Sequence, residues 1–125
     1  MVLLVLALAC RVPAQFDPTT YKNLTDLKPE VVALYRTFTA GALDEARVAQ
    51  VALKLDQAYE YEKGKGGRNH LTVDQFEAIR RIFQRAVLNR RNGGKWTDPS
   101  ATDYEKDIAE AFDLAIASEI IKSQG

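Results

Sequence analysis

The sequence contains few of the residues on which covalent or metal chemistry depends. Cys10 is the single cysteine, so no disulfide can form within the chain, and a zinc site built from several cysteines is excluded. His70 is the single histidine and Met1 the single methionine, and the Glu-x-x-His pattern of di-iron helical bundles is absent. The sequence therefore predicts neither a metal ion nor a cofactor.

Motifs for catalysis are missing as well. None of the three serines lies in the Gly-x-Ser-x-Gly motif of a hydrolase, and the glycines around residue 65 lack the spacing of a phosphate-binding P-loop. Acidic side chains recur along the expected helices, where they are typical of a solvated face rather than of an acid–base pair. These acids are Glu60, Glu62, Glu105, Asp107 and Glu110. We therefore expect a protein that is not an enzyme.

The formal net charge is zero, which argues against a dedicated nucleic-acid-binding protein. The charge is unevenly distributed, with a net +7 over residues 63–96 and a net −5 over residues 97–125. We expect these two segments to pack side by side and compensate each other. The alternative is a group of outward-facing arginines that attracts lipid headgroups or cell-wall polymer; its members are Arg80, Arg81, Arg85, Arg90 and Arg91.

Residues 1–9, MVLLVLALA, contain no polar side chain. The run is shorter than the about 20 residues of a transmembrane helix, but it has the length of a signal-peptide apolar core. Ala7-Leu8-Ala9 supplies the small-x-small pattern that signal peptidases accept, and Cys10 follows directly. The N-terminus is therefore interpreted as an export signal.

Small residues directly before a cysteine, at the end of a Leu/Val run, resemble the lipobox of bacterial lipoproteins. The resemblance covers ten residues and implies that Cys10 receives a diacylglycerol and that residues 1–9 are removed. It also implies an exported protein, anchored on the periplasmic or extracellular side of a membrane. Arg11 after the cysteine favours, by family analogy, the outer membrane. Two alternatives stay open: cleavage after Ala14, which leaves a soluble exported protein, and an uncleaved N-terminal segment.

Residues 10–27 are predicted to be the lipidated cysteine and an extended tether, because Pro13 and Pro18 lie in a stretch without apolar periodicity. Residues 28–125 have helical periodicity, and no run alternates strictly as a strand would. We expect an all-α, up-and-down helical bundle with a shorter N-terminal helix from Pro29 and three long helices, which start near Asp44, Thr72 and Thr102. The sequence shows no internal repeat of usable length.

Partner binding is the function class that remains. The candidate residues are Trp96, Arg81, Arg85 and Tyr61, with Trp96 either closing one end of the bundle or exposed as an aromatic anchor. We expect a non-enzymatic, membrane-tethered helical module of the bacterial cell envelope that binds another envelope protein or polymer. The alternative is an inhibitor or immunity-type protein that acts against an envelope-acting toxin or lytic enzyme.

Overall fold

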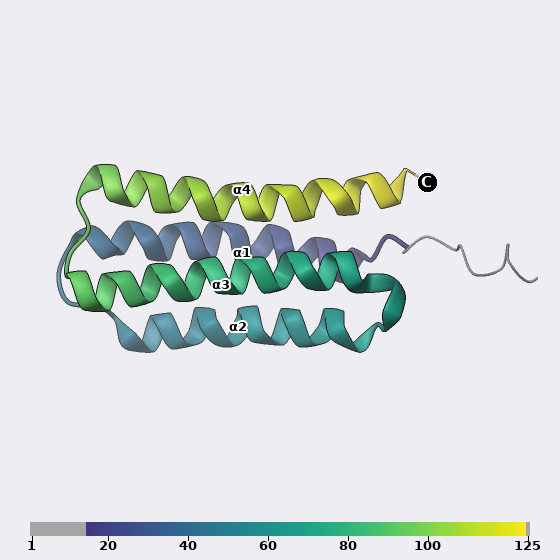
Figure 1. Cartoon of the computed structure of the whole chain (residues 1–125), viewed down its shortest axis with the longest axis horizontal. Coiled ribbons are helices and arrows are strands. Elements are labelled where there is room, and N and C mark those ends of the chain that lie inside the picture. Colours follow the sequence, from purple (N-terminus) through teal and green to yellow (C-terminus); the bar gives the residue numbers. More distant parts are fainter. Residues whose placement is uncertain (1–14, 125) are drawn as a thin grey trace, which may run out of the picture.

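The computed structural model describes residues 15–124, and this part of the chain forms four α-helices and no strand (Figure 1). The helices are α1 (Pro18–Arg36), α2 (Glu45–Gly64), α3 (His70–Gly93) and α4 (Asp98–Ser123), with 3-10 turns η1 (Thr37–Thr39) and η2 (Gly67–Asn69) between them. The predicted all-α class is confirmed. The predicted signal peptide and Cys10 lie outside the described residues.

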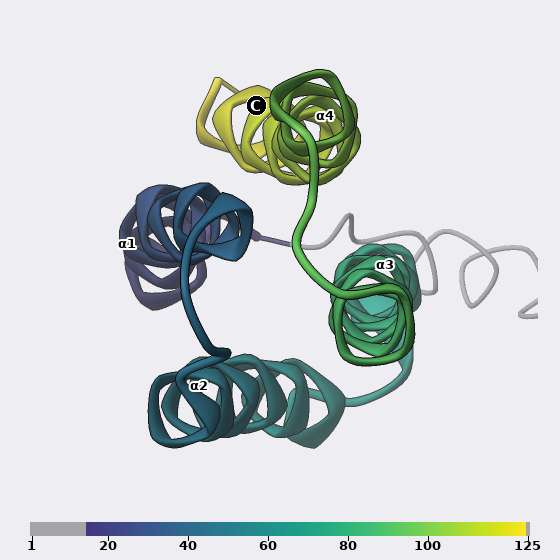
Figure 2. The ribbon, with the colours of Figure 1, turned by 90° about the vertical axis from the view of Figure 1, so that its left-hand side faces the viewer.

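The helices run alternately up and down, and each packs against its neighbours in chain order, with α4 closing the bundle against α1 (Figure 2). Because four helices bring the chain back to its starting end, α1 begins beside the end of α4 (Figure 1). We call this the N-terminal end of the bundle. None of the described helices is both long enough and apolar enough to cross a bilayer.

The N-terminal helix is the shortest of the four, as expected, but only by one residue relative to α2, and its expected start at Pro29 is wrong because α1 begins at Pro18. Asp17 caps α1 by accepting a hydrogen bond from the Thr19 N–H at 2.8 Å, and Pro18 occupies the first helical turn, where its missing N–H costs nothing. Residues 18–27, which the sequence assigned to the tether, are therefore helical.

Pro29 does not start the helix but lies in its interior. A proline there has no N–H to donate, so the Thr25 carbonyl lacks its usual partner four residues later. Leu24 and Leu27 nevertheless continue the apolar stripe that contains Val31, and all three side chains are at most 5% exposed. This burial holds the helix together across the proline.

The hairpins α1–α2 and α3–α4 repeat one pattern of buried positions, which the sequence does not reveal. Thr20 and Thr72 are the third residues of α1 and α3, and the same spacings lead from each to five further buried residues. These are Leu24, Leu27, Val31, Leu34 and Tyr35 in α1, and Phe76, Ile79, Phe83, Ala86 and Val87 in α3. The second helices of the two hairpins also share one spacing of buried residues. These are Val51, Leu55, Ala58 and Glu62 in α2, and Ile108, Phe112, Ala115 and Glu119 in α4.

Aromatic rings fill the opposite end of the bundle. Trp96, in the α3–α4 connection, stacks on Tyr104 with ring centroids 4.2 Å apart and meets Tyr35 and Phe38 edge-on. Its backbone N–H donates to the Phe38 carbonyl at 3.0 Å, and its indole N–H donates to Asn89 at 3.0 Å. Trp96 is only 6% exposed, so it closes the bundle, and its use as an exposed anchor is wrong.

Tyr35 carries a hydroxyl that is buried without a hydrogen-bond partner among the described residues, and burial raises its pKa. We predict that Tyr35→Phe leaves the free energy of unfolding unchanged or raises it by up to about 1 kcal/mol, because it removes a desolvated polar group and keeps the ring. Tyr35→Leu should instead cost about 2 kcal/mol through lost ring contacts. Urea unfolding measures both, and a clear loss in Tyr35→Phe would show that the hydroxyl is bonded.

Candidate functional site

Two clusters of threonine, glutamate and lysine occupy the N-terminal end of the bundle. The first Thr–Glu–Lys cluster consists of Thr20, Glu62 and Lys65, and the second consists of Thr72, Glu119 and Lys122. In each, the glutamate and lysine are three residues apart near a helix end, and the threonine belongs to the first turn of the preceding helix of the hairpin. Thus the repeat of the core continues into the polar residues.

In the first cluster Glu62 is fully buried. It accepts a short hydrogen bond from the Thr20 hydroxyl and further bonds from Lys65 and the Asn69 amide, both at 2.8 Å. Lys65 also donates to Thr20 at 2.7 Å and to Asp17 at 2.9 Å. The three protons of its ammonium group thus have three acceptors, and both carboxylate oxygens of Glu62 are bonded.

In the second cluster Glu119 is likewise fully buried. Lys122 donates to Glu119 at 2.6 Å and to the Thr72 hydroxyl at 2.8 Å. The backbone N–H of Asp17 donates to the second oxygen of Glu119 at 3.3 Å. Because Asp17 precedes α1 and Glu119 lies in α4, this bond joins the first helix to the last.

Asp17 therefore contacts both clusters. Its carboxylate accepts from the Tyr61 hydroxyl at 2.6 Å and from Lys65, and it caps α1 through Thr19. Partial burial alone would raise the pKa of Asp17, but these hydrogen bonds outweigh burial and hold the pKa well below its usual range. For Lys65, partial burial alone would lower the pKa, but hydrogen bonds to Glu62 and Asp17 raise it.

The expectation that Glu62 lies on a solvated face is wrong. Its carboxylate and that of Glu119 are bonded to lysine and to other donors, which is the arrangement of structural charge pairs. Within residues 15–124, no group of three or more histidine, cysteine or acidic side chains is placed to hold a metal ion. The two clusters thus join the helix ends through buried, hydrogen-bonded ion pairs.

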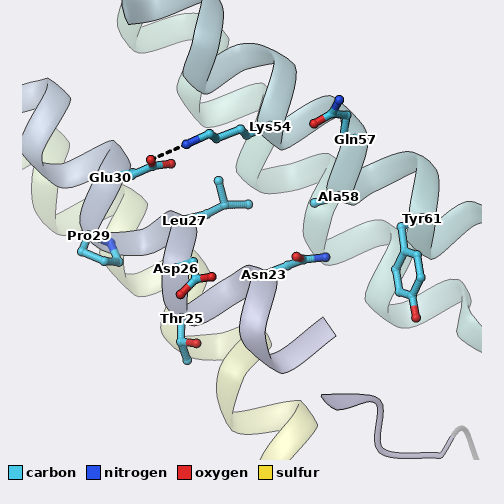
Figure 3. A pocket seen from close by; sticks show the side chains of 10 residues that line it. All are labelled: Asn23, Thr25, Asp26, Leu27, Pro29, Glu30, Lys54, Gln57, Ala58 and Tyr61. Carbon is cyan, nitrogen blue, oxygen red and sulfur yellow. Dashed lines mark hydrogen bonds and ion pairs between the residues drawn. The ribbon is translucent and has the colours of Figure 1, made fainter. Parts of the chain in front are cut away.

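A groove between α1 and α2 offers space for a ligand. It has a volume of about 570 Å³, and six residues of α1 line it opposite four of α2 (Figure 3). The α1 residues are Asn23, Thr25, Asp26, Leu27, Pro29 and Glu30, and the α2 residues are Lys54, Gln57, Ala58 and Tyr61. Leu27 and Ala58, each 5% exposed, form its apolar floor.

The groove breaks the symmetry between the two hairpins. The positions in α3 and α4 that correspond to Asn23 and Tyr61 are Gln75 and Ser118, and there the Gln75 amide donates directly to the Ser118 hydroxyl at 3.0 Å. In the described part of the first hairpin, Asn23 and Tyr61 are not bridged in this way, because the Tyr61 hydroxyl donates to Asp17, and the α1 wall contains Pro29. An internal proline is a costly departure from helix chemistry, and such departures are expected at functional sites.

The predicted site residues do not form one site. Tyr61 lines the groove, whereas Arg81 and Arg85 are exposed on α3, where Arg81 pairs with Glu77 of its own helix at 2.8 Å. Trp96 is buried at the opposite end, and Cys10 lies outside the described residues. Of these residues, Tyr61 alone belongs to the groove.

The helix α3 packs beside α4, as predicted, but two arginines of α3 pair with acids of α2 instead of α4. Arg80 pairs with Asp56 at 2.8 Å and Arg91 with Glu45 at 2.5 Å, so these two arginines are neutralised by acids of α2. Arg90 is 6% exposed and donates to the Gly41 carbonyl at 2.9 Å, so it does not face outward with the other arginines. The outward-facing arginine group is therefore incomplete.

Sequence reasoning missed the α1 wall of the groove because it placed residues up to 27 in the tether. The available signal was Asp17-Pro18, an N-cap residue followed by proline in the first turn. No family model, curated protein or solved structure matches this chain.

We predict that Glu62→Gln lowers the free energy of unfolding by about 2–3 kcal/mol, because it leaves the Lys65 ammonium without its buried counter-charge. Glu119→Gln should behave similarly through Lys122. The control Glu60→Gln changes an exposed side chain in the same helix turn and should stay within about 0.5 kcal/mol of the parent. Equal effects in all three variants, measured by urea unfolding, would contradict the role of the clusters.

The lowered pKa of Asp17 predicts acid sensitivity. A carboxylate whose pKa is lowered in the folded state contributes stability at pH values above its unfolded pKa of about 3.9. That stability is lost as the pH falls from the unfolded pKa toward and through the folded pKa. Asp17→Asn should therefore lower the urea midpoint at pH 7 and make the decline of stability between about pH 5 and pH 3 shallower. Asp26→Asn, which removes an exposed pair with Lys22, is the control and should keep the parent pH profile.

Proposed function

We propose that this chain is a non-enzymatic, membrane-tethered helical module of the bacterial cell envelope that binds another envelope protein or polymer in the α1–α2 groove. The observation that carries this proposal is the groove itself, which is present in one hairpin and bridged at the equivalent place in the other. Departures from an otherwise consistent pattern are expected at functional sites, which supports the groove as the binding surface.

The lining of the groove suits a ligand with many hydrogen-bonding groups. Asn23 and Gln57 face it from opposite walls, and each amide offers both donors and an acceptor (Figure 3). Lys54 and Glu30 pair across it at 2.5 Å, and this exposed pair can open for a charged group. A peptide segment or a sugar polymer has this chemistry, and both occur in a cell envelope.

The position of α1 shortens the proposed tether. Six residues lie between Cys10 and Asp17, and the seven steps from one Cα to the next span at most about 25 Å. A lipidated Cys10 would therefore hold the groove, which begins one turn into α1, close to the membrane. A partner would have to lie near the same membrane.

Mass spectrometry of the mature N-terminus from cells tests the anchor. We expect a diacylglycerol-modified Cys10 as the first residue, and a Cys10→Ala variant that is neither lipidated nor recovered with membranes. An unmodified cut after Ala14, or an intact Met1, would contradict the membrane tether.

Site-specific photo-crosslinking in cells tests the groove. A photoreactive residue at Gln57 should give a discrete adduct that is lost when Asn23→Lys fills the groove, because both side chains line it. The same residue at Asp103, which is exposed near the other end of α4, is the matched control and should give no adduct of that mass. The same adducts from both positions, or none from either, would exclude the groove as the binding surface.

A further inference from the structure

Exposed large apolar side chains gather at the N-terminal end of the bundle. Of the eight that the described residues contain, five lie within the outermost turns at this end, and the other three are leucines elsewhere on the helices. The five are Tyr21, Tyr61, Leu71, Ile120 and Ile121. Leu71 is 55% exposed and Ile121 is 68% exposed, which is unfavourable in water for side chains of this size.

These side chains come from all four helices. Tyr21 is in the first turn of α1 and has the ring of Phe16 6.2 Å away. Leu71 at the start of α3 lies near the end of α4, since the adjacent Thr72 is bonded to Lys122. Lys63 and Arg68 flank the connection between α2 and α3 and are exposed at the same end. Apolar side chains, tyrosines and basic residues at one end are the composition of a membrane-interface surface.

The chain also leaves the bundle at this end. The described part begins at Gln15, two residues before Asp17, and Asp17 is hydrogen-bonded to both Thr–Glu–Lys clusters. With Cys10 in a bilayer, as the proposed function requires, at most about 25 Å of chain separates the lipid from this surface. The opposite end lies about 30 Å further away, the length of a 20-residue helix.

We propose that the N-terminal end of the bundle docks on the lipid bilayer, with Tyr21, Leu71, Ile120 and Ile121 at the boundary between headgroups and acyl chains. Lys63 and Arg68 then face the headgroup phosphates. We favour the bilayer over a second copy of the chain because basic Lys63 and Arg68 lie at the same end as the apolar side chains, and the described chain begins there. The proposal rests on the proposed membrane tether and adds the orientation of the bundle.

The test uses tryptophan fluorescence of the full chain in vesicles of phosphatidylethanolamine and phosphatidylglycerol with brominated acyl chains. Native Trp96 is at the far end of the bundle and serves as an internal control, so the parent protein should not be quenched. Docked side chains insert about 5–10 Å, to the boundary between headgroups and acyl chains. Ile121→Trp should therefore come near the brominated chains and lose at least about half of its added fluorescence. Leu114→Trp, similarly exposed on the same helix but two turns before Ile121, should lose little.

A second pair of variants tests the apolar contact itself. Leu71→Glu in the Ile121→Trp background should reduce the quenching at least about twofold, since a charged side chain opposes insertion. Leu53→Glu, a leucine of nearly equal exposure away from this end, should leave it unchanged. Circular dichroism establishes that each variant is folded. Absence of quenching in Ile121→Trp, or equal quenching in Ile121→Trp and Leu114→Trp, would overturn the proposal.

The failure of the tether and the failure of docking can be separated. When mass spectrometry finds no lipid on Cys10, the same variants are attached to vesicles through a maleimide lipid coupled to the Cys10 thiol. Quenching of Ile121→Trp in that coupled protein supports the docking surface even though the natural anchor is wrong. Its absence overturns the docking surface whatever the natural anchor.

Discussion

The arrangement of the four helix ends depends on two buried carboxylates. Glu62 and Glu119 lie at the N-terminal end of the bundle, each fully buried and each paired with a lysine three residues later. A buried charge that loses its partner is strongly destabilising, so the ends of all four helices must meet in the correct register. Asp17 joins the two clusters through its backbone and its side chain, which fixes where the chain leaves the bundle. The position of Asp17 at the start of α1 thus follows from hydrogen bonds and ion pairs.

The same two clusters show that the bundle consists of two similar hairpins. The core positions match from the threonines onward, and an alanine, Ala58 or Ala115, precedes each buried glutamate by one turn. Because the two hairpins are otherwise similar, the places where they differ indicate where a function could be located. Gln75 and Ser118 bridge α3 to α4, whereas the corresponding part of α1 and α2 is open and contains Pro29. Apolar burial alone gives no reason for this difference, and for that reason we place ligand binding in the groove.

Different interactions hold the opposite end of the bundle together. Contacts among four aromatic rings close it, those of Trp96, Tyr35, Phe38 and Tyr104. Arg90 donates a hydrogen bond to the Gly41 carbonyl in the turn before α2. One end is therefore rich in aromatic contacts, and the other combines buried ion pairs with exposed apolar side chains. In the proposed arrangement the groove opens beside the bilayer, where a tethered partner would meet it.

The sequence by itself determined the all-α class and most of the apolar stripes, because a period of 3.6 residues is visible in one dimension. It also indicated that Trp96 could close an end of the bundle. It misplaced the start of α1, since Pro29 and Pro18 are both compatible with a first helical turn, and only the packing of Leu24 and Leu27 distinguishes them. Tertiary structure alone decided that Glu62 is buried, that α3 pairs its arginines with α2, and that a groove separates α1 from α2. Each of these depends on which residues of distant segments meet, and the pattern within one helix does not contain that information.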